Sequence, residues 1–258
     1  MKILLISDTH GRLDSINELA EKTGADCCFH LGDLCTYTRE SVRYFTQDIL
    51  YKQLKHSPLC PPETLEQFAG DTEGLRKLAE QFRTYGSFED YYAGNKHFNI
   101  PVYAVFGNND DAALEKQLLK KPPRNLLFLN EKKQVFLENF MICGIGGGFY
   151  EFFEDGSTFQ GCCFHPEQIE ELQKNASLTD PETPRILLMH VPPSENELLI
   201  RLIRSIKPVL TLCGHTHHWG EAVIDGRFPV LNLTKSTAGY AVLELNGKNW
   251  NCRKYELK

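Results

Sequence analysis

Lys-Ile-Leu-Leu-Ile-Ser-Asp-Thr-His-Gly, residues 2–11, is the stretch that decides the fold. Its apolar run, residues 3–6, is too short for a helix and predicts a strand buried on both faces, as in the middle of an α/β sheet. Asp8 and His10 follow, two positions apart, and Gly11 lets the chain turn away. Alternate residues at an extended strand end point the same way. We therefore expect a carboxylate and an imidazole to converge where open α/β sheets bind ligands.

Four further apolar runs also end in Asp, Asn or His. They are Phe-His-Leu-Gly-Asp (29–33), Val-Tyr-Ala-Val-Phe-Gly-Asn-Asn-Asp (102–110), Ile-Leu-Leu-Met-His (186–190) and Val-Leu-Thr-Leu-Cys-Gly-His-Thr-His (209–217). Three of the five runs contain a glycine at this point, which would let backbone come close to a ligand. One Asp-x-His alone is more simply a turn beside a surface histidine. The repetition favours a functional site.

The composition narrows the class of protein. A chain of 258 residues is long enough for one large α/β domain or two small ones. A formal charge of -6 gives no general basic surface for duplex nucleic acid and disfavours that partner. The net charge does not exclude a local basic cleft. No apolar run approaches the roughly 18 residues that span a bilayer, and no signal segment precedes the first strand. The nine cysteines form no C-x-x-C pair, which fits a reduced, cytoplasmic setting without a membrane.

The order of the elements predicts an α/β (α+β) fold that starts parallel and finishes antiparallel. The first strand, a helix ended by Gly24 and a strand over 25–30 form a βαβ unit. Turns at Asp225-Gly226 and Asn246-Gly247 predict hairpins near the C-terminus. Between these regions we expect three short strands in a meander, over 126–129, 134–137 and 140–145.

Residues 36–98 interrupt this order. Apolar residues at helical spacing predict two amphipathic helices, separated by a turn at Pro58, Pro61 and Pro62. We interpret the segment as a helical insertion within a single domain over 1–258. It is either a lid that shapes the substrate pocket or a set of extra helices packed on the sheet edge, and the sequence favours neither.

The strand ends together supply two carboxylates, one amide and four imidazoles, from Asp8, His10, Asp33, Asn108, His190, His215 and His217. Histidine with carboxylate and no thiolate suits Mn²⁺, Fe or Zn²⁺ rather than Ca²⁺ or a structural zinc. Seven ligands are too many for one tetrahedral ion. They suit two ions, about 3.5–4 Å apart, that share one carboxylate.

At these positions the chain resembles the calcineurin-like metallophosphoesterase family. The five blocks of that family are D-x-H, G-D, G-N-H-[D/E], H and G-H-x-H. They stand here, in family order, as Asp8-Thr-His10, Gly32-Asp33, Gly107-Asn-Asn-Asp110, His190 and Gly214-His-Thr-His217. The resemblance implies an αββα sandwich of two packed mixed β-sheets flanked by helices.

The resemblance also implies a ligand set and a reaction. One ion would be held by Asp8, His10, Asp33 and His217, and the other by Asp33, Asn108, His190 and His215, with Asp33 bridging. We expect two divalent ions, Mn²⁺ ahead of Fe or Zn²⁺. A metal-bridging hydroxide would attack phosphorus and the ester oxygen would leave, without a covalent enzyme intermediate. The expected substrate is a phosphate monoester or diester, from a small molecule or a nucleotide.

One position departs from the family pattern. The histidine of the third block, thought to protonate the leaving group, is Asn109 here. An amide can donate a hydrogen bond to phosphate but cannot deliver a proton, and general acid help contributes about 10²–10⁴-fold. We therefore assign Asn109 and Asp110 to the catalytic positions with a weakened role. Other proton sources that the sequence leaves open are His56, His97, His165 and His218.

Three further interpretations remain beside this one, for Arg12, for His30 and for the function of the whole chain. Arg12 could bind a substrate phosphate together with Asn109, or it could be a solvated arginine at the start of a helix. His30 lies inside a strand and is expected to be a core histidine or a partner of a ligand. The alternative function is a catalytically weakened family member that acts as a metal-bound scaffold for other proteins. The missing histidine favours the scaffold, whereas the complete ligand set favours the enzyme.

Overall fold

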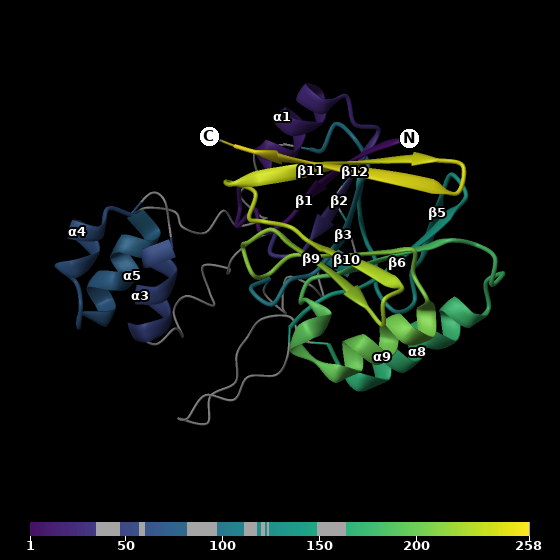
Figure 1. Cartoon of the computed structure of the whole chain (residues 1–258). Helices are drawn as coiled ribbons and strands as arrows, with labels where there is room; N and C mark the ends of the chain where they lie inside the picture. The colour runs from purple at the N-terminus through teal and green to yellow at the C-terminus, as the bar shows by residue number, and fades with distance from the viewer. Residues whose placement is uncertain are drawn as a thin grey trace.

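The computed structural model describes residues 1–34, 47–56, 60–81, 97–110, 118–119, 122, 124–148 and 164–257. Two mixed six-stranded sheets lie face to face, with helices on their outer sides (Figure 1). Helix α1 (Asp14–Thr23) covers the first sheet, and helices α8 (Pro166–Ser177) and α9 (Glu197–Ile206) cover the second. The αββα architecture is therefore confirmed.

The first sheet has the strand order β12-β11-β1-β2-β3-β4. Its parallel part consists of β1 (Lys2–Ile6), β2 (Cys27–Leu31), β3 (Val102–Val105) and β4 (Leu126–Phe128). On the other side of β1 the sheet continues antiparallel, with β11 (Gly239–Asn246) and β12 (Asn249–Glu256). The predicted first strand thus lies in the interior of its sheet.

The second sheet has the order β5-β6-β7-β8-β10-β9. Its four parallel strands are β6 (Phe140–Ile145), β7 (Arg185–Met189), β8 (Leu210–Cys213) and β10 (Phe228–Asn232). The antiparallel edges are β5 (Val135–Leu137) and β9 (Gly220–Ile224). The hairpins β9–β10 and β11–β12 turn at Asp225-Gly226 and after Asn246, as the sequence predicted.

The predicted meander is wrong. Strand β4 pairs parallel with β3 in the first sheet, whereas β5 and β6 form an antiparallel hairpin in the second. The chain therefore crosses between the sheets after Leu129. Short strands look alike in sequence, and their pairing partners are set by burial against distant segments, which local periodicity does not report.

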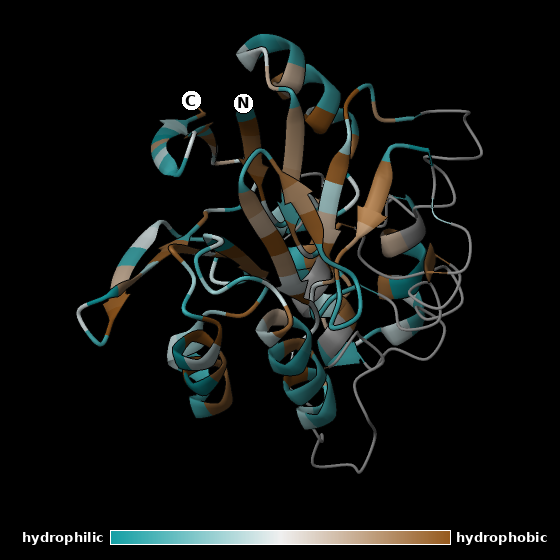
Figure 2. Ribbon diagram, turned by 90° about the vertical axis from the view of Figure 1, so that its right-hand side faces the viewer, coloured by the Kyte–Doolittle hydropathy of each residue, from teal (hydrophilic) through white to brown (hydrophobic). Residues whose placement is uncertain are grey.

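Alternation along β1 explains why the strand is apolar on both faces. Ile3 and Leu5 lie in the core between the two sheets, whereas Leu4 and Ile6 lie in the core beneath α1, where Ile16 also packs. Figure 2 shows hydrophobic residues concentrated in the central strands. A shift of β1 by one residue would exchange the side chains of its two faces.

Helices α3 (Gln47–His56), α4 (Pro62–Glu66) and α5 (Thr72–Gln81) form a group beside the sheets (Figure 1). They have a hydrophobic cluster of their own, made of Leu50, Leu54, Cys60, Leu65, Leu75, Leu78 and Ala79. These helices lie within the segment expected to be a helical insertion. Residues 36–46, 57–59 and 82–96 of that segment lie outside the described residues. Among the described helices, none is long and apolar enough to cross a membrane.

Candidate metal centre

All seven side chains selected from the sequence meet at the carboxyl ends of five strands. Three of these strands, β1, β2 and β3, are neighbours in the first sheet, and β7 and β8 are neighbours in the second. A continuous series of contacts shorter than 4 Å connects the side chains, in the order Asp8, His217, His10, Asp33, His190, Asn108 and His215. The two sheets thus contribute to one site.

We had expected extended backbone at Asp8 and His10. The structure shows a different conformation at this site. Left-handed backbone occurs at five of the seven residues: Asp8 (φ 53°), His10 (φ 44°), Asp33 (φ 53°), His215 (φ 71°) and His217 (φ 61°). The loops after β1 and β2 stay paired, because the backbone N–H groups of Asp8 and His10 donate to the carbonyls of Gly32 and Asp33 at 3.1 and 3.0 Å. Left-handed residues other than glycine are strained and cluster at functional sites.

Three motif glycines allow the loops to pack this closely. A Cβ atom on Gly107 would lie 2.0 Å from Asp33 Oδ1, and one on Gly32 would lie 2.5 Å from His190 Nδ1. A Cβ atom on Gly214 would lie 1.9 Å from Ser7 Oγ. The sequence suggested that these glycines let the backbone come close to a ligand. In the structure, the glycine backbone comes close to other protein groups.

The first group of donors consists of Asp8, His10 and His217. Nε2 of His217 lies 3.2 Å from Asp8 Oδ1 and 3.4 Å from His10 Nε2. Asp8 is 2% exposed, and its other oxygen, Oδ2, accepts a hydrogen bond from Ser7 Oγ at 2.5 Å and one from the His215 N–H at 3.2 Å. The carboxylate is thus held on one side, and Oδ1 faces the two imidazoles.

The second group consists of Asp8, Asp33 and His190, and Asn108 and His215 adjoin it. Asn108 Oδ1 lies 2.8 Å from His190 Nε2 and 2.9 Å from His215 Nδ1. His190 Nδ1 donates to the Leu31 carbonyl at 2.7 Å, which leaves Nε2 to face the site. Asp8 belongs to both groups. Asp33 also approaches the first group, because its Oδ2 is 3.9 Å from His10 Nε2 while its Oδ1 is 3.5 Å from His190 Nε2.

The donor set fits divalent ions. Among the contacts of the described residues, Asp8 Oδ1 and His10 Nδ1 are buried polar atoms without a hydrogen bond, and a bound ion would satisfy such atoms. His217 Nε2 is the imidazole nitrogen that approaches Asp8 Oδ1, at 3.2 Å. Carboxylate, amide and imidazole donors without thiolate suit Mn²⁺, Fe or Zn²⁺.

Buried charges perturb the acid–base behaviour of this centre. Burial alone would raise the pKa of Asp8, but His217 and the charges of His190 and His10 outweigh it and hold the pKa well below its ordinary value. Burial opposes protonation of His190, yet Asp33 and Asp8 raise its pKa. Burial and the neighbouring His190 lower the pKa of His215. Asp8 is therefore a charged carboxylate inside the protein, a state that requires cationic partners.

Asn109 and Asp110 close the loop after β3. The Asn109 backbone N–H donates to Asp33 Oδ1 at 2.8 Å, and its side-chain Nδ2 donates to Asp33 Oδ2 at 2.7 Å. Asp110 is 2% exposed, and its Oδ2 accepts from the Gly107 N–H at 2.7 Å. Arg12 is exposed at the start of α1, two residues after His10. Asn109 thus contacts the centre directly, and Asp110 holds the loop.

The other candidate proton sources have different surroundings. His165 is the N-cap of α8, where its backbone N–H donates to Gln168 Oε1 at 2.7 Å. His97 and His218 are exposed, and the side chain of His56 lies outside the described residues. His30 is fully buried, and its Nε2 lies 2.9 Å from Thr9 Oγ1, which confirms a core histidine.

Sequence reasoning missed four residues that support or adjoin the centre. Thr234 Oγ1 donates to the His217 carbonyl at 2.8 Å, and Ser236 Oγ donates to the Asp8 carbonyl at 3.2 Å. Ser7 binds Asp8, and Glu195 Oε2 lies 3.7 Å from His215 Nε2. Ser7 and Glu195 lie within seven residues of a motif residue and could have been considered. Thr234 and Ser236 follow β10, and only the pairing of β10 with β8 brings them here.

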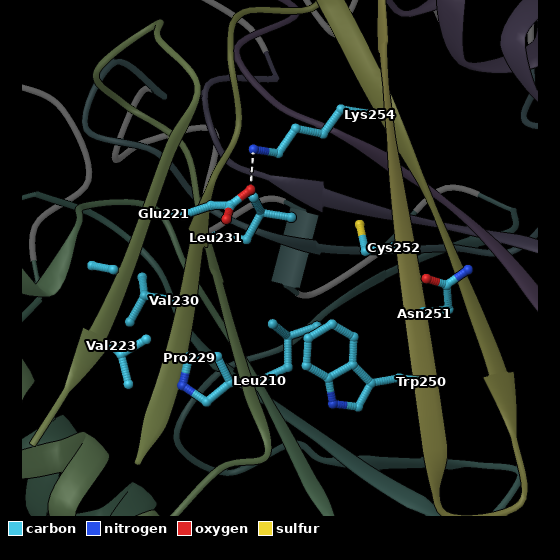
Figure 3. A pocket seen from close by; sticks show the side chains of 11 residues that line it. Leu210, Glu221, Val223, Pro229, Val230, Leu231, Trp250, Asn251, Cys252 and Lys254 are labelled. Carbon is cyan, nitrogen blue, oxygen red and sulfur yellow. Dashed lines mark hydrogen bonds and ion pairs between the residues drawn. The ribbon is translucent and has the colours of Figure 1, made fainter. Parts of the chain in front are cut away.

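A separate cavity of about 300 Å³ lies between the open edges of the two sheets (Figure 3). Residues of β8, β9, β10 and β12 line it, and Glu221 and Lys254 form an ion pair across it. None of the seven candidate ligands is among its lining residues. We therefore place the chemistry at the strand ends, where the titratable groups converge, rather than in this cavity.

The fold and the donor cluster define an α/β protein with a candidate metal site between two sheets. A model of the calcineurin-like phosphoesterase family matches residues 1–219, and the chain belongs to this family. Members are generally phosphoesterase hydrolases that act on phosphate esters and typically bind two divalent metals. No match was found among curated proteins.

Solved structures share the fold at low sequence identity. TT1561 from Thermus thermophilus is 16% identical, with a TM-score of 0.55 over 98% of this chain and 97% of its own. A dimetal phosphatase from Danio rerio is 13% identical, with a TM-score of 0.56 over 98% and 95%. GAP50, described as the anchor in the inner membrane complex of Plasmodium, is 12% identical, with a TM-score of 0.54 over 99% and 84%. At these identities the likeness concerns the fold alone.

Proposed function

We propose that this chain is a dinuclear-metal phosphoesterase that hydrolyses a phosphate monoester or diester of a small molecule or nucleotide. Asp8, His10, Asp33 and His217 would hold one ion, and Asp33, Asn108, His190 and His215 the other. Mn²⁺ is the preferred ion, with Fe or Zn²⁺ as alternatives. Two such ions, when bound, lower the pKa of a water and offset charge on the transferring phosphoryl group.

The observation that carries this proposal is the position of Asp33. Its two oxygens face histidines of different groups, with Oδ1 3.5 Å from His190 Nε2 and Oδ2 3.9 Å from His10 Nε2. Asp33 is 1% exposed, so its charge is costly without partners. A buried carboxylate between two sets of imidazoles is what a shared ligand of two ions requires.

The chain's own groups position the substrate and limit the reaction. Asn109 would donate a hydrogen bond to a phosphate oxygen, and exposed Arg12 would bind another with its guanidinium group. Asn109 cannot protonate a leaving group. We therefore infer that esters with good leaving groups, such as aryl esters, are hydrolysed faster than simple alkyl esters.

Helices α3, α4 and α5 would act as a cap within a single domain over 1–258. Their separate hydrophobic cluster supports a unit that can shape the substrate entrance without contributing metal ligands. A variant in which residues 47–81 are replaced by a flexible linker should keep metal binding but lose discrimination between small and large esters. Unchanged selectivity would indicate that these helices only pack on the sheet edge.

A second candidate function is a metal-bound scaffold for other proteins. Two observations favour it: Asn109 occupies the family's histidine position, and a protein of the same fold is described as an anchor. The enzyme is the better-supported candidate, because the buried carboxylate of Asp8 belongs to two adjoining groups of metal-binding side chains.

The experiment combines metal analysis with turnover of p-nitrophenyl phosphate and bis-p-nitrophenyl phosphate in added Mn²⁺. We expect about two ions per chain and turnover that is lost in Asp33→Asn. Asp180→Asn is the matched control, because the Asp180 side chain binds only the nearby Glu182 N–H among the hydrogen bonds described. Bound metal without turnover of either ester would favour the scaffold, and absence of metal would refute both functions.

A further inference from the structure

Two histidines of the metal centre, His190 and His215, differ in which ring nitrogen faces the site and in what holds the other one. In His190, Nδ1 donates to the Leu31 carbonyl at 2.7 Å, so that Nε2 faces Asn108. His215 is turned the other way: its Nδ1 lies 2.9 Å from Asn108 Oδ1, and its Nε2 lies 3.7 Å from Glu195 Oε2. Glu195 therefore occupies, at His215, the place that a backbone carbonyl occupies at His190.

The local sequence fixes the backbone of Glu195. Strand β7 ends at Met189, and Pro192 leads into a single 3₁₀ turn, Pro193–Glu195. The Glu195 N–H donates to the Pro192 carbonyl at 3.1 Å. Asn196 then caps α9 through a hydrogen bond from the Leu198 N–H at 2.8 Å. A rigid turn and a helix cap therefore hold the residue on both sides.

The side chain of Glu195 can reach His215. Its side chain is 37% exposed and that of His215 is 30% exposed, so neither is locked in a packed core. A separation of 3.7 Å is longer than a hydrogen bond, which needs about 3.2 Å or less. A small torsional adjustment of a half-exposed glutamate closes this gap, and contacts at such sites tighten when the ligand binds.

We propose that Glu195 is a positioning residue for the metal centre, one that accepts the Nε2–H of His215 and leaves Nδ1 free to bind a metal ion. The inference rests on the proposed function, because it assigns His215 as a ligand. A carboxylate on the outer nitrogen of a ligating histidine fixes the tautomer and ring orientation, and its loss typically weakens metal binding about 10–100-fold. Glu195 touches neither the substrate nor the metal in this role.

The test is calorimetric titration of metal-free protein with Mn²⁺, comparing wild type, Glu195→Ala, Glu195→Gln and Glu197→Gln. In Glu195→Ala we expect one of the two ions to bind about 10–100-fold more weakly and the other to bind as in wild type. Glu195→Gln should bind much better than Glu195→Ala, because its amide oxygen still accepts from Nε2–H. Glu197→Gln is the control, since Glu197 pairs only with Arg201 and Arg204 in the contacts described and should bind as wild type.

A second readout separates orientation from a general loss of structure. In the Zn²⁺-loaded wild type, the ¹⁵N spectrum of the imidazoles should show His215 protonated at Nε2, with the signal assigned by its absence in His215→Gln. In Glu195→Ala this signal should shift or broaden, while thermal unfolding of the metal-free protein stays unchanged.

The outcomes distinguish this inference from the proposed function. If wild type binds two ions and Glu195→Ala binds both as tightly as wild type does, the positioning role is refuted and the proposed function stands. If Glu195→Gln binds as weakly as Glu195→Ala, the carboxylate charge matters rather than the accepted hydrogen bond, and the role is again refuted. If wild type itself fails to bind two ions, the proposed function fails and the inference fails with it.

Discussion

Asn109 holds both oxygens of Asp33. Its backbone N–H donates to Oδ1 at 2.8 Å and its side-chain Nδ2 donates to Oδ2 at 2.7 Å. The residue at the family's histidine position therefore supports a carboxylate at the middle of the metal centre. An amide serves well in that role, since it is a fixed donor at every pH, but it has no proton to give to a leaving group.

Restoring the histidine should change the substrate preference. In Asn109→His we expect turnover of alkyl phosphate esters to rise at least about tenfold and that of p-nitrophenyl phosphate to rise less, because general acid help contributes about 10²–10⁴-fold where the leaving group is poor. The measurement is kcat for both esters in saturating Mn²⁺. Asn109→Ala is the comparison that removes the amide without adding an acid. Equal or lower turnover of the alkyl ester in Asn109→His would contradict this explanation.

Metal removal should destabilise the protein. Each ion that binds only the folded state stabilises it by about 2.7 kcal/mol at a concentration one hundred times Kd. For a chain of this length, we expect each bound Mn²⁺ to raise Tm by about 5–10 °C over protein in EDTA. Differential scanning calorimetry measures the shift. The Tm shift should shrink strongly in Asp33→Asn and persist in the control Asp180→Asn. A full Tm shift in Asp33→Asn would show that Asp33 is not a metal ligand.

Gly107 should be intolerant of a side chain. An added Cβ would lie 2.0 Å from Asp33 Oδ1 and 2.2 Å from the Asp33 backbone nitrogen, so the two loops would have to separate. Gly107→Ala should lower the free energy of unfolding by about 1–3 kcal/mol and weaken metal binding. Gly220→Ala is the control, because its Cβ would meet only Asn232 Cβ at 3.4 Å, and it should change stability by less than about 0.5 kcal/mol. Urea unfolding of the two variants gives both values, and equal losses would contradict the packing argument.

His30 should make the metal-free protein sensitive to acid. Burial lowers the pKa of His30 from 6.5 to about 3, so the unfolded chain takes up a proton on this residue more readily than the folded one. The stability contributed by neutral His30 is complete above pH 6.5 and is lost as the pH falls toward 3. This residue should contribute a slope of up to about 1.4 kcal/mol per pH unit.

Urea unfolding in EDTA between pH 7 and pH 5 tests the role of His30. His30→Gln carries a side chain that does not titrate, and its free energy of unfolding should fall less steeply with acid than that of wild type. Parallel slopes would show that His30 keeps an ordinary pKa in the folded protein.

The sequence alone determined the fold class and the identity of the converging residues. Short apolar runs, such as residues 3–6, indicate buried strands. Polar residues that follow such runs lie at the carboxyl edge of the sheet. The five ordered motifs then specified the family. These features are local in the chain, which is why a sequence can show them.

Only the tertiary structure decided how these residues meet. Strands β4 and β5 look alike in sequence but belong to different sheets, because pairing depends on distant partners. Asp adopts left-handed backbone more readily than most residues, but at Asp8 and Asp33 this backbone accompanies hydrogen bonds between two loops, and those bonds exist only in the folded chain. Glu195 reaches His215 only because β7 and β8 are neighbours. Contacts between separate segments are set by packing of the whole core, and packing is a property of the folded chain.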